Sequence, residues 1–222
     1  MEPKLFQIGF NKTATTALFW LFINSGHSAL HSSGRRARRA GHPVVSKLHP
    51  QLVIHHNMCA GRPAVQGLED FEAHFDMEHD LPNSPIKIEN FKFFDRLARD
   101  YPRAKFVLNV RECDAWVMSR ARHNDGQYLK RSMARLAQSE AEVLDQWRDE
   151  HARHHNAVRA FFAAEQDRLL VFDIDRDPID TLVDFCAPDF ALDPAQWGKA
   201  RVTDDVVQKL GWERGNAQSR IP

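Results

Sequence analysis

The sequence has few of the features that mark disulfide-rich, metal-binding or nucleic-acid-binding chains. Its three cysteines, Cys59, Cys113 and Cys186, lie far apart and show no paired metal-ligand spacing. An odd, scattered set of this kind is typical of reduced thiols in an intracellular protein. Lys+Arg and Asp+Glu both number 30, so the net charge is zero and no overall basic charge points to a nucleic-acid partner.

Long apolar runs are also lacking. The longest, residues 17–23, is far shorter than the roughly 18 apolar residues of a membrane-spanning helix. A strand beginning near residue 4 would leave no room for a signal peptide, so we expect a soluble, cytoplasmic protein without a membrane span. We find no internal repeat or linker, and 222 residues suffice for one sizeable core, so residues 1–222 are predicted to form a single domain.

The first stretch of the chain has the pattern of a strand, a loop and a helix. Residues 5–8 form an apolar run, Gly9 follows, and a polar loop precedes the apolar residues 17–23. This order places backbone N–H groups and the positive end of a helix dipole at one point, which is a site for an anion. The ammonium group of Lys12 and the hydroxyls of Thr13, Thr15 and Thr16 would add further donors. We therefore expect a phosphate-like group to bind here.

The loop does not have the spacing of a nucleoside-triphosphate P-loop, G-x-x-x-x-G-K-[ST]. Counting from Gly9, the second Gly falls on Ala14 and the Lys falls on Thr15, while Lys12 stands three residues too early. An ordinary strand–turn–helix with threonine caps remains an alternative for this stretch.

Strands and helices alternate along the chain, which predicts a P-loop-type α/β fold with a mainly parallel central sheet and helices on both faces. Residues 105–110 form a doubly buried strand that ends at Arg111, and Ser119 follows eight residues later. Ligands of such folds bind beyond the carboxyl ends of the strands, so Arg111 and Ser119 could bracket a phosphate. The alternative is a structural ion pair of Arg111 with Glu112 or Asp114.

Three segments have less decisive patterns. Residues 41–85 contain several prolines and histidines without a sustained period, and we expect loops that form the acceptor side of the site. The arginine-rich residues 35–39 form either a solvated helix face or an edge that faces an anion. His151 and His154 lie on the apolar stripe of a long helix, near residues 139–164, and this favours packing over metal binding.

Two motifs in this order resemble those of sulfotransferases that use 3′-phosphoadenosine 5′-phosphosulfate (PAPS). Residues 12–16 are similar to the 5′-phosphosulfate loop K-[TS]-G-T-[TS], with Ala14 in place of Gly. Residues 105–120 resemble the 3′-phosphate motif, with its Arg at a strand end and a later Ser. The resemblance extends through residues 101–102 and 169–174 and is closest to small bacterial-type soluble sulfotransferase domains. Residues 209–212 only faintly resemble the C-terminal cofactor motif of cytosolic relatives.

The resemblance implies the donor PAPS and the product 3′-phosphoadenosine 5′-phosphate (PAP). Because a sulfuryl group carries less charge than a phosphoryl group, we expect no metal requirement. Lys12 would stabilise the bridging oxygen as PAP leaves. The implied cofactor-binding residues are Asn11, Lys12, Thr13, Ala14, Thr15, Thr16, Arg111 and Ser119.

An acceptor hydroxyl also needs a base. Cytosolic relatives have a K-x-H sequence before the 3′-phosphate strand, and here Lys87-Ile88-Glu89 has Glu in place of His. We therefore expect Glu89 to be the base, with partial burial raising its pKa. The alternative for Glu89 is a salt bridge with Lys87 or Arg96. The other candidates for the base are Asp76, Glu78, His79 and His31.

The acceptor stays open among sugars, lipid headgroups, phenols and small alcohols or amines, and so does the oligomeric state. Two other functions are compatible with the motifs. One is an ATP- and Mg²⁺-dependent kinase of a small molecule, in which Asp173 is the only candidate for the metal-binding Asp at a strand end. The other is a catalytically silent PAP-binding or scaffold protein.

Overall fold

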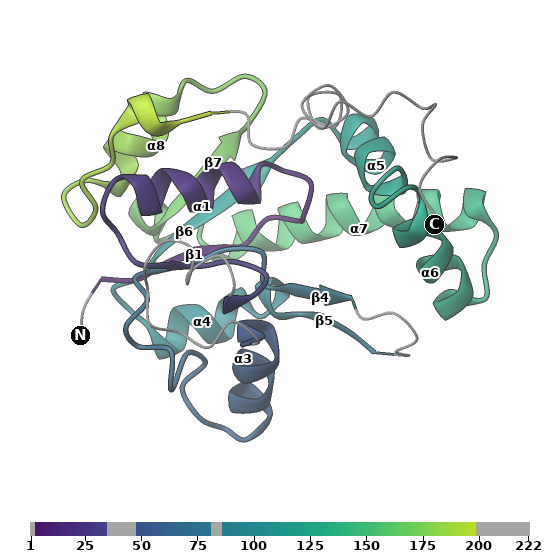
Figure 1. Ribbon diagram of the computed structural model, residues 1–222, viewed down its shortest axis with the longest axis horizontal. Coiled ribbons are helices and arrows are strands. Elements are labelled where there is room, and N and C mark those ends of the chain that lie inside the picture. Colours follow the sequence, from purple (N-terminus) through teal and green to yellow (C-terminus); the bar gives the residue numbers. More distant parts are fainter. Residues whose placement is uncertain (1–2, 35–47, 81–85, 199–222) are drawn as a thin grey trace, which may run out of the picture.

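A computed structural model describes residues 3–34, 48–80 and 86–198 of the chain. Its central sheet has five strands in the order β2-β3-β1-β6-β7, and every neighbouring pair is parallel, which confirms the predicted α/β fold (Figure 1). The strands are β1 (Leu5–Gln7), β2 (Ala29–Leu30), β3 (Ala73–His74), β6 (Lys105–Val110) and β7 (Leu169–Asp173).

Helices cover both faces of this sheet. One buried apolar cluster joins the sheet to α1 (Thr15–Asn24) and α8 (Ile179–Cys186). A second cluster lies on the opposite face and includes residues of five helices. These are α3 (Pro50–Cys59), α4 (Phe94–Asp100), α5 (Cys113–Ala121), α6 (Gln127–Leu136) and α7 (Glu140–Phe161). The described residues also form three short 3₁₀ helices: η1 (Asn90–Lys92), η2 (Gln166–Arg168) and η3 (Pro194–Gln196).

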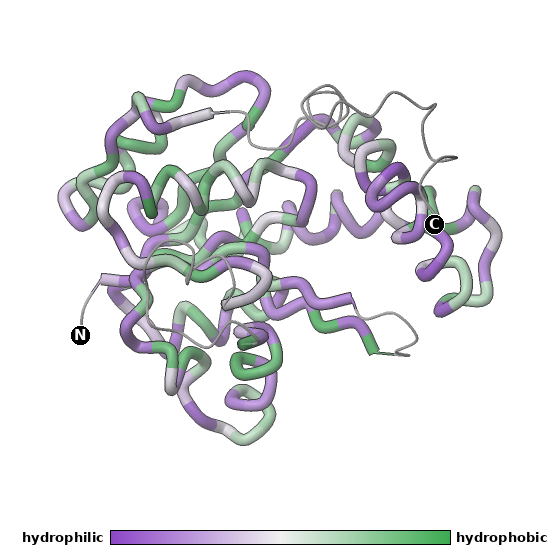
Figure 2. The backbone as a smooth tube through the Cα atoms, viewed as in Figure 1, coloured by the Kyte–Doolittle hydropathy of each residue, from purple (hydrophilic) through white to green (hydrophobic). Residues whose placement is uncertain are grey.

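Strand β6 is buried on both sides, as its continuous apolar sequence predicts. Phe106 and Leu108 belong to the cluster beneath α4 and α7, whereas Val107 belongs to the cluster beneath α1. Successive side chains of a strand point to opposite faces, so a strand between two helical layers has apolar residues at consecutive positions, as at residues 106–108. Figure 2 shows the contrast with α7, along which hydrophilic residues predominate.

Residues 41–85 differ from the loops that we expected. Their described part contains α3, the central strand β3 and strand β4 (Glu78–Asp80), which pairs antiparallel with β5 (Lys87–Glu89). Only two residues of β3 join the sheet ladder, and this is too short to produce a recognisable period. Its position between β1 and β2 nevertheless places the following residue, Phe75, and Asp76 at the carboxyl edge of the sheet.

The arginine-rich residues 35–39 and the C-terminal residues 209–212 lie outside the described residues. Within the described part of the chain, no helix combines the length and apolar character needed to span a bilayer.

Candidate functional site

The loop between β1 and α1 is held against strand β6 by buried amides. Gln7 Nε2 donates to Gly9 O and to Asn109 Oδ1, both at 2.6 Å, and Asn109 Nδ2 donates to Thr13 Oγ1 at 2.7 Å. A Cβ atom at Gly9 would lie 2.3 Å from Asn109 O, so the backbone approach requires glycine at this position. The two parallel strands therefore fix the shape of the loop.

Two residues of the loop adopt left-handed backbone conformations. Lys12 has φ 66° and Ala14, the N-cap of α1, has φ 63°. Among the described residues, no side chain hydrogen-bonds the first N–H groups of α1. These groups and the helix dipole can therefore act on an anion.

The left-handed conformation of Ala14 explains why the related motif has glycine there. We expect Ala14→Gly to raise the free energy of unfolding by about 0.5–1 kcal/mol, because relief of a left-handed strain of about 1–2 kcal/mol outweighs the added entropy of the unfolded chain. Urea denaturation measures the change. The matched variant Ala17→Gly, inside α1, should instead lower stability by about 1 kcal/mol. Equal losses in both variants would contradict the left-handed assignment.

The three threonines of the loop do not share one role. The Thr13 side chain is buried and its hydroxyl donates to the carbonyl of Phe10, so the expectation that this hydroxyl donates to the anion is wrong. Thr15 and Thr16 begin α1, and each Oγ1 lies 3.3 Å from Nε2 of His31. These two hydroxyls are therefore the ones that the structure places at the start of the helix.

Helix α5 packs directly beside the loop. Trp116 Nε1 donates to Asn11 O at 2.9 Å, and Lys12 Nζ lies 3.5 Å from Nδ1 of His123, which follows α5. The Asn11 side chain is held by β4, because its Nδ2 donates to Glu78 Oε1 at 2.9 Å. The loop and α5 thus form one continuous edge of the site (Figure 1).

Arg111 and Ser119 belong to this same edge, since β6 is the neighbour of β1 and leads into α5. Arg111 forms an ion pair with Asp175, with Nε 2.9 Å from Oδ2, and not with Glu112 or Asp114 as the structural alternative would have it. Glu112 instead accepts hydrogen bonds from two N–H groups and caps α5. Ser119 is half-buried, one residue before the buried Arg120.

Glu89 is tightly paired with lysines. Its carboxylate lies 2.5 Å from Lys87 Nζ and 2.8 Å from Lys92 Nζ. Burial alone would raise the pKa of Glu89, but the two ammonium groups outweigh it and lower this pKa to about 2. The expected rise is therefore wrong, and the salt bridge with Lys87 is confirmed. A carboxylate held in this state is a weak base at neutral pH.

Glu78 is a buried structural hub. Beyond Asn11, its carboxylate accepts from Arg120 Nη2 at 2.9 Å and from Tyr128 OH at 2.5 Å, and Lys87 Nζ lies 3.4 Å away. Only 4% of its side chain is exposed. With its oxygens occupied in this way, Glu78 holds the loop in place through Asn11.

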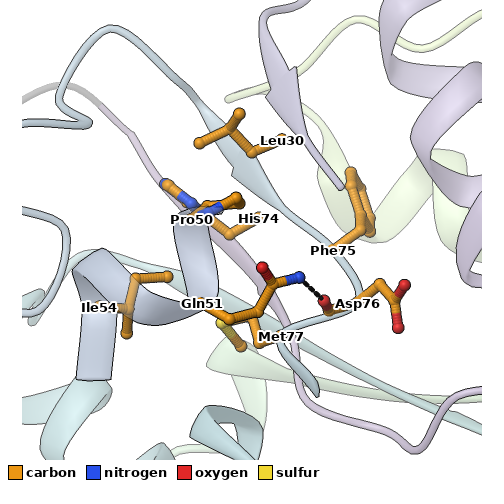
Figure 3. Close-up of a pocket in the computed structure, with 8 residues that line it drawn as sticks. All are labelled: Leu30, Pro50, Gln51, Ile54, His74, Phe75, Asp76 and Met77. Atoms are coloured by element: carbon orange, nitrogen blue, oxygen red, sulfur yellow. Dashed lines mark hydrogen bonds between the residues drawn. The ribbon is translucent and has the colours of Figure 1, made fainter. Parts of the chain in front are cut away.

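Asp76 is the candidate whose carboxylate lies beside His31, the histidine next to the start of α1. Its backbone has φ 52°, its N–H donates to Gln7 Oε1 at 2.9 Å, and its carbonyl accepts from Gln51 Nε2 at 2.7 Å. Figure 3 shows this last bond at the rim of a shallow hollow beside β3, with the Asp76 carboxylate directed away from Gln51. Asp76 Oδ2 lies 3.4 Å from Nδ1 of His31, and 19% of the Asp76 side chain is exposed. Such strained, doubly held residues cluster at functional sites.

The remaining histidine candidates pack against other side chains. His79 is partly buried, its ring lies tilted beside that of His49 with 5.0 Å between the ring centroids, and burial lowers the pKa of His79. His151 and His154 lie against Phe10, and burial lowers both pKa values, which confirms the packing role. No set of three or more His, Cys, Asp or Glu side chains that could hold a metal ion occurs among the residues that the structure describes.

Several residues of this site escaped the sequence reasoning, in particular Gln7, Asn109 and His123. Gln7 and Asn109 are polar residues inside otherwise apolar strands, and both are fully buried. Buried polar side chains need hydrogen-bond partners, so their presence in such strands is a signal that could have been used. His123 has no comparable local signal.

The fold and the loop define a class of protein, the parallel α/β proteins with a candidate anion site between the first strand and the first helix. A family model described as "Sulfotransferase domain" matches residues 4–189, a span that includes the loop, Arg111 and Ser119. The chain therefore belongs to the sulfotransferase family. A search of curated proteins found no match.

Proposed function

We propose that the protein transfers a sulfuryl group from PAPS to a hydroxyl or amine of a small-molecule, lipid or carbohydrate acceptor. Family membership supports sulfuryl transfer. The observation that carries the choice of PAPS is the shared edge formed by the loop at residues 12–16 and by β6 and α5, which carry Arg111 and Ser119. The hydrogen bond from Trp116 to Asn11 O joins these two parts, so one adenosine bisphosphate could lie across both.

Each part of the edge suits one end of the nucleotide. The first N–H groups of α1 and the hydroxyls of Thr15 and Thr16 would hold the 5′-phosphosulfate. Lys12 would neutralise charge on the bridging oxygen as PAP leaves. Arg111, with its planar fork, and the Ser119 hydroxyl would hold the 3′-phosphate.

The reaction is an in-line displacement at sulfur. The acceptor oxygen or nitrogen forms a bond to sulfur, the bond from sulfur to the PAP oxygen breaks, and the acceptor proton passes to a base. Catalysis rests on positioning and on charge stabilisation by the loop. A sulfuryl group carries less charge than a phosphoryl group, so we expect Lys12 and the threonines to suffice without a metal.

Asp76 is the base in this proposal. Glu89 and Glu78 are held in ion pairs with lysine and arginine. The Asp76 carboxylate is partly exposed and lies 3.4 Å from His31, which contacts the start of α1. An acceptor proton transferred to Asp76 would then pass to solvent. The role of Glu89 becomes that of a structural partner of Lys87.

The kinase alternative is less well supported. Asp173 ends β7, and β6 separates β7 from β1. The Asp173 carboxylate accepts from Asp175 N at 3.0 Å and lies 3.8 Å from Arg176 Nε. Both contacts stabilise the turn that follows β7. A silent PAP-binding protein would share the donor site and differ only in lacking turnover.

Thermal unfolding with PAP, ATP and ATP plus Mg²⁺ separates these functions. A ligand at one hundred times its Kd adds about 2.7 kcal/mol to the stability of the protein. We expect PAP to raise Tm by roughly 5–10 °C, by the size scaling of a domain of this length, and ATP with Mg²⁺ to have a much smaller effect. Stabilisation by ATP and Mg²⁺ without any by PAP would contradict the proposal. Transfer from labelled PAPS in a screen of hydroxyl and amine acceptors distinguishes the enzyme from the silent binder.

A further inference from the structure

Two histidines of α7 reach the carboxyl ends of the two strands that carry the proposed donor site. His154 Nε2 lies 2.7 Å from Ile8 O, the last carbonyl before Gly9 and the loop. The His151 imidazole forms a hydrogen bond with the backbone of Arg111, the first residue after β6. His151 and His154 are only 9% and 7% exposed, so both bonds are shielded from water.

The two rings donate through different nitrogen atoms. Burial lowers the pKa of both histidines, so each ring is neutral at pH 7 and has a single N–H group. In His154 the proton is on Nε2, because the Ile8 carbonyl can only accept. The bond to Arg111 favours the charged form of His151, so its acceptor is the Arg111 carbonyl. Since His151 Nε2 has no hydrogen-bond partner among the described residues, Nδ1 is the donor.

The spacing of the two histidines matches the spacing of the strands. Pairing of β1 with β6 ends at Gln7, and Ile8 N makes a last bond to Val107 O at 2.8 Å. From there one chain enters the loop, whereas β6 continues to Val110. Neighbouring strands lie about 4.8 Å apart, and side chains at i and i+3 of a helix lie about 5–6 Å apart. One face of α7 can therefore contact both strand ends.

We propose that His151 and His154 are positioning residues of the donor site, each of which fixes one of its two halves. This inference rests on the proposed function. His154 sets the point at which the loop at residues 12–16 leaves β1, and thus the place of the 5′-phosphosulfate. His151 sets the point at which Arg111 leaves β6, and thus the place of the 3′-phosphate. Neither ring touches the nucleotide, and both act through the backbone.

His155 is a matched control on the same helix. Its ring centroid lies 3.9 Å from that of His151 and 5.9 Å from that of Phe10, and the residue is 9% exposed. In the described part of the chain, this ring is not hydrogen-bonded to the end of β1 or of β6, and its Nε2 has no partner. His155 therefore shares the packing of the other two histidines without their bonds to the strand ends.

Calorimetric titrations with PAP and AMP test the two roles separately. Both nucleotides carry a 5′-phosphate, and only PAP carries the 3′-phosphate. His154→Leu should weaken the binding of both by the same factor, about 3- to 10-fold, and leave the preference for PAP unchanged. His151→Leu should weaken PAP binding by a similar factor and leave AMP binding unchanged, so the preference falls. His155→Leu should bind both nucleotides like the wild type.

Amide side chains test the hydrogen bonds themselves. Asn Nδ2 can replace His Nδ1, and Gln Nε2 can replace His Nε2, because each pair of atoms is the same number of bonds from Cα. His151→Asn and His154→Gln should therefore keep the wild-type affinities, whereas His151→Gln and His154→Asn should reproduce the losses of the leucine variants. A role in packing alone would not reverse the order of the two amides between the two positions.

The outcomes separate this inference from the proposed function. If His151→Leu keeps the wild-type preference for PAP, or if His155→Leu loses as much affinity as the other two variants, the positioning role is wrong and the donor assignment stands. If the wild type binds neither nucleotide, or binds both equally, the proposed donor site itself fails. Where circular dichroism shows that a leucine variant does not fold, the two amides at that position decide, and equal affinities of the two overturn the inference.

Discussion

Replacing Glu78 with alanine will lower the free energy of unfolding by about 3–5 kcal/mol, because it leaves a buried charge without its counter-charge. Arg120 is fully buried, and its strongest described ion pair is with Glu78 at 2.9 Å. Burial opposes the charged form of Arg120, but Tyr128 and Glu78 raise the Arg120 pKa further above its ordinary value. Glu150, 3.7 Å from Nη1, is a weaker substitute. Urea denaturation monitored by tryptophan fluorescence measures the loss.

Glu89→Ala is the matched control for this prediction. Glu89 lies directly opposite Glu78 in the β4–β5 register, but it pairs with lysines that remain partly exposed. Lys87 and Lys92 keep 14% and 30% of their side chains exposed, so the ammonium groups left behind can reach water and this loss should be smaller. Equal losses in the two variants would show that Arg120 does not depend on Glu78.

Replacing Arg111 with alanine will weaken PAP binding by about 10- to 100-fold. A hydrogen bond to a charged group contributes about 1.5–3 kcal/mol, and each 1.4 kcal/mol corresponds to a factor of ten in Kd. Calorimetric titration with PAP measures the change. Arg148→Ala is the control, because Arg148 pairs with Asp114 at the start of α5, and its side chain is 42% exposed. A similar loss in both variants would indicate general electrostatic attraction instead of a specific phosphate contact.

Local sequence patterns predict much of this fold. The sequence of strand, loop and helix at β1 and α1, the doubly buried strand β6 and the helix α7 all have apolar patterns that span several residues. Such patterns reflect burial against whichever element covers them, so they can be identified before the partner is known. The same holds for His151 and His154, whose apolar neighbours along the helix predict packing.

Long-range contacts could not be predicted in this way. Strand β3 has only two residues in the ladder, and its place in the sheet depends on β1 and β2. The pKa of Glu89 is likewise set by Lys87 and Lys92, so burial alone gave the wrong direction. The role of Glu78 depends on Arg120, 42 residues away in the sequence, and on the position of α5.

The candidate site also contains both kinds of residue: some are predicted from local motifs, and others depend on long-range contacts. Motif spacing predicts Lys12, Arg111 and Ser119, because each stands at a fixed distance from a strand. His31 was only one of several possible bases, because its significance comes from Thr15, Thr16 and Asp76 meeting around it. Residues such as His31 can therefore be identified only from contacts between side chains of different elements, which sequence motifs do not contain.

The central claim is that one nucleotide spans the loop at residues 12–16 and the Arg111–Ser119 pair. The most direct test compares the Kd values of PAP and AMP, which differ only in the 3′-phosphate, for the wild type and for Arg111→Ala. We predict that the wild type prefers PAP by at least about tenfold, and that Arg111→Ala loses this preference while its AMP affinity stays unchanged. An undiminished preference for PAP in Arg111→Ala, or an equal loss of affinity for both nucleotides, would contradict the claim.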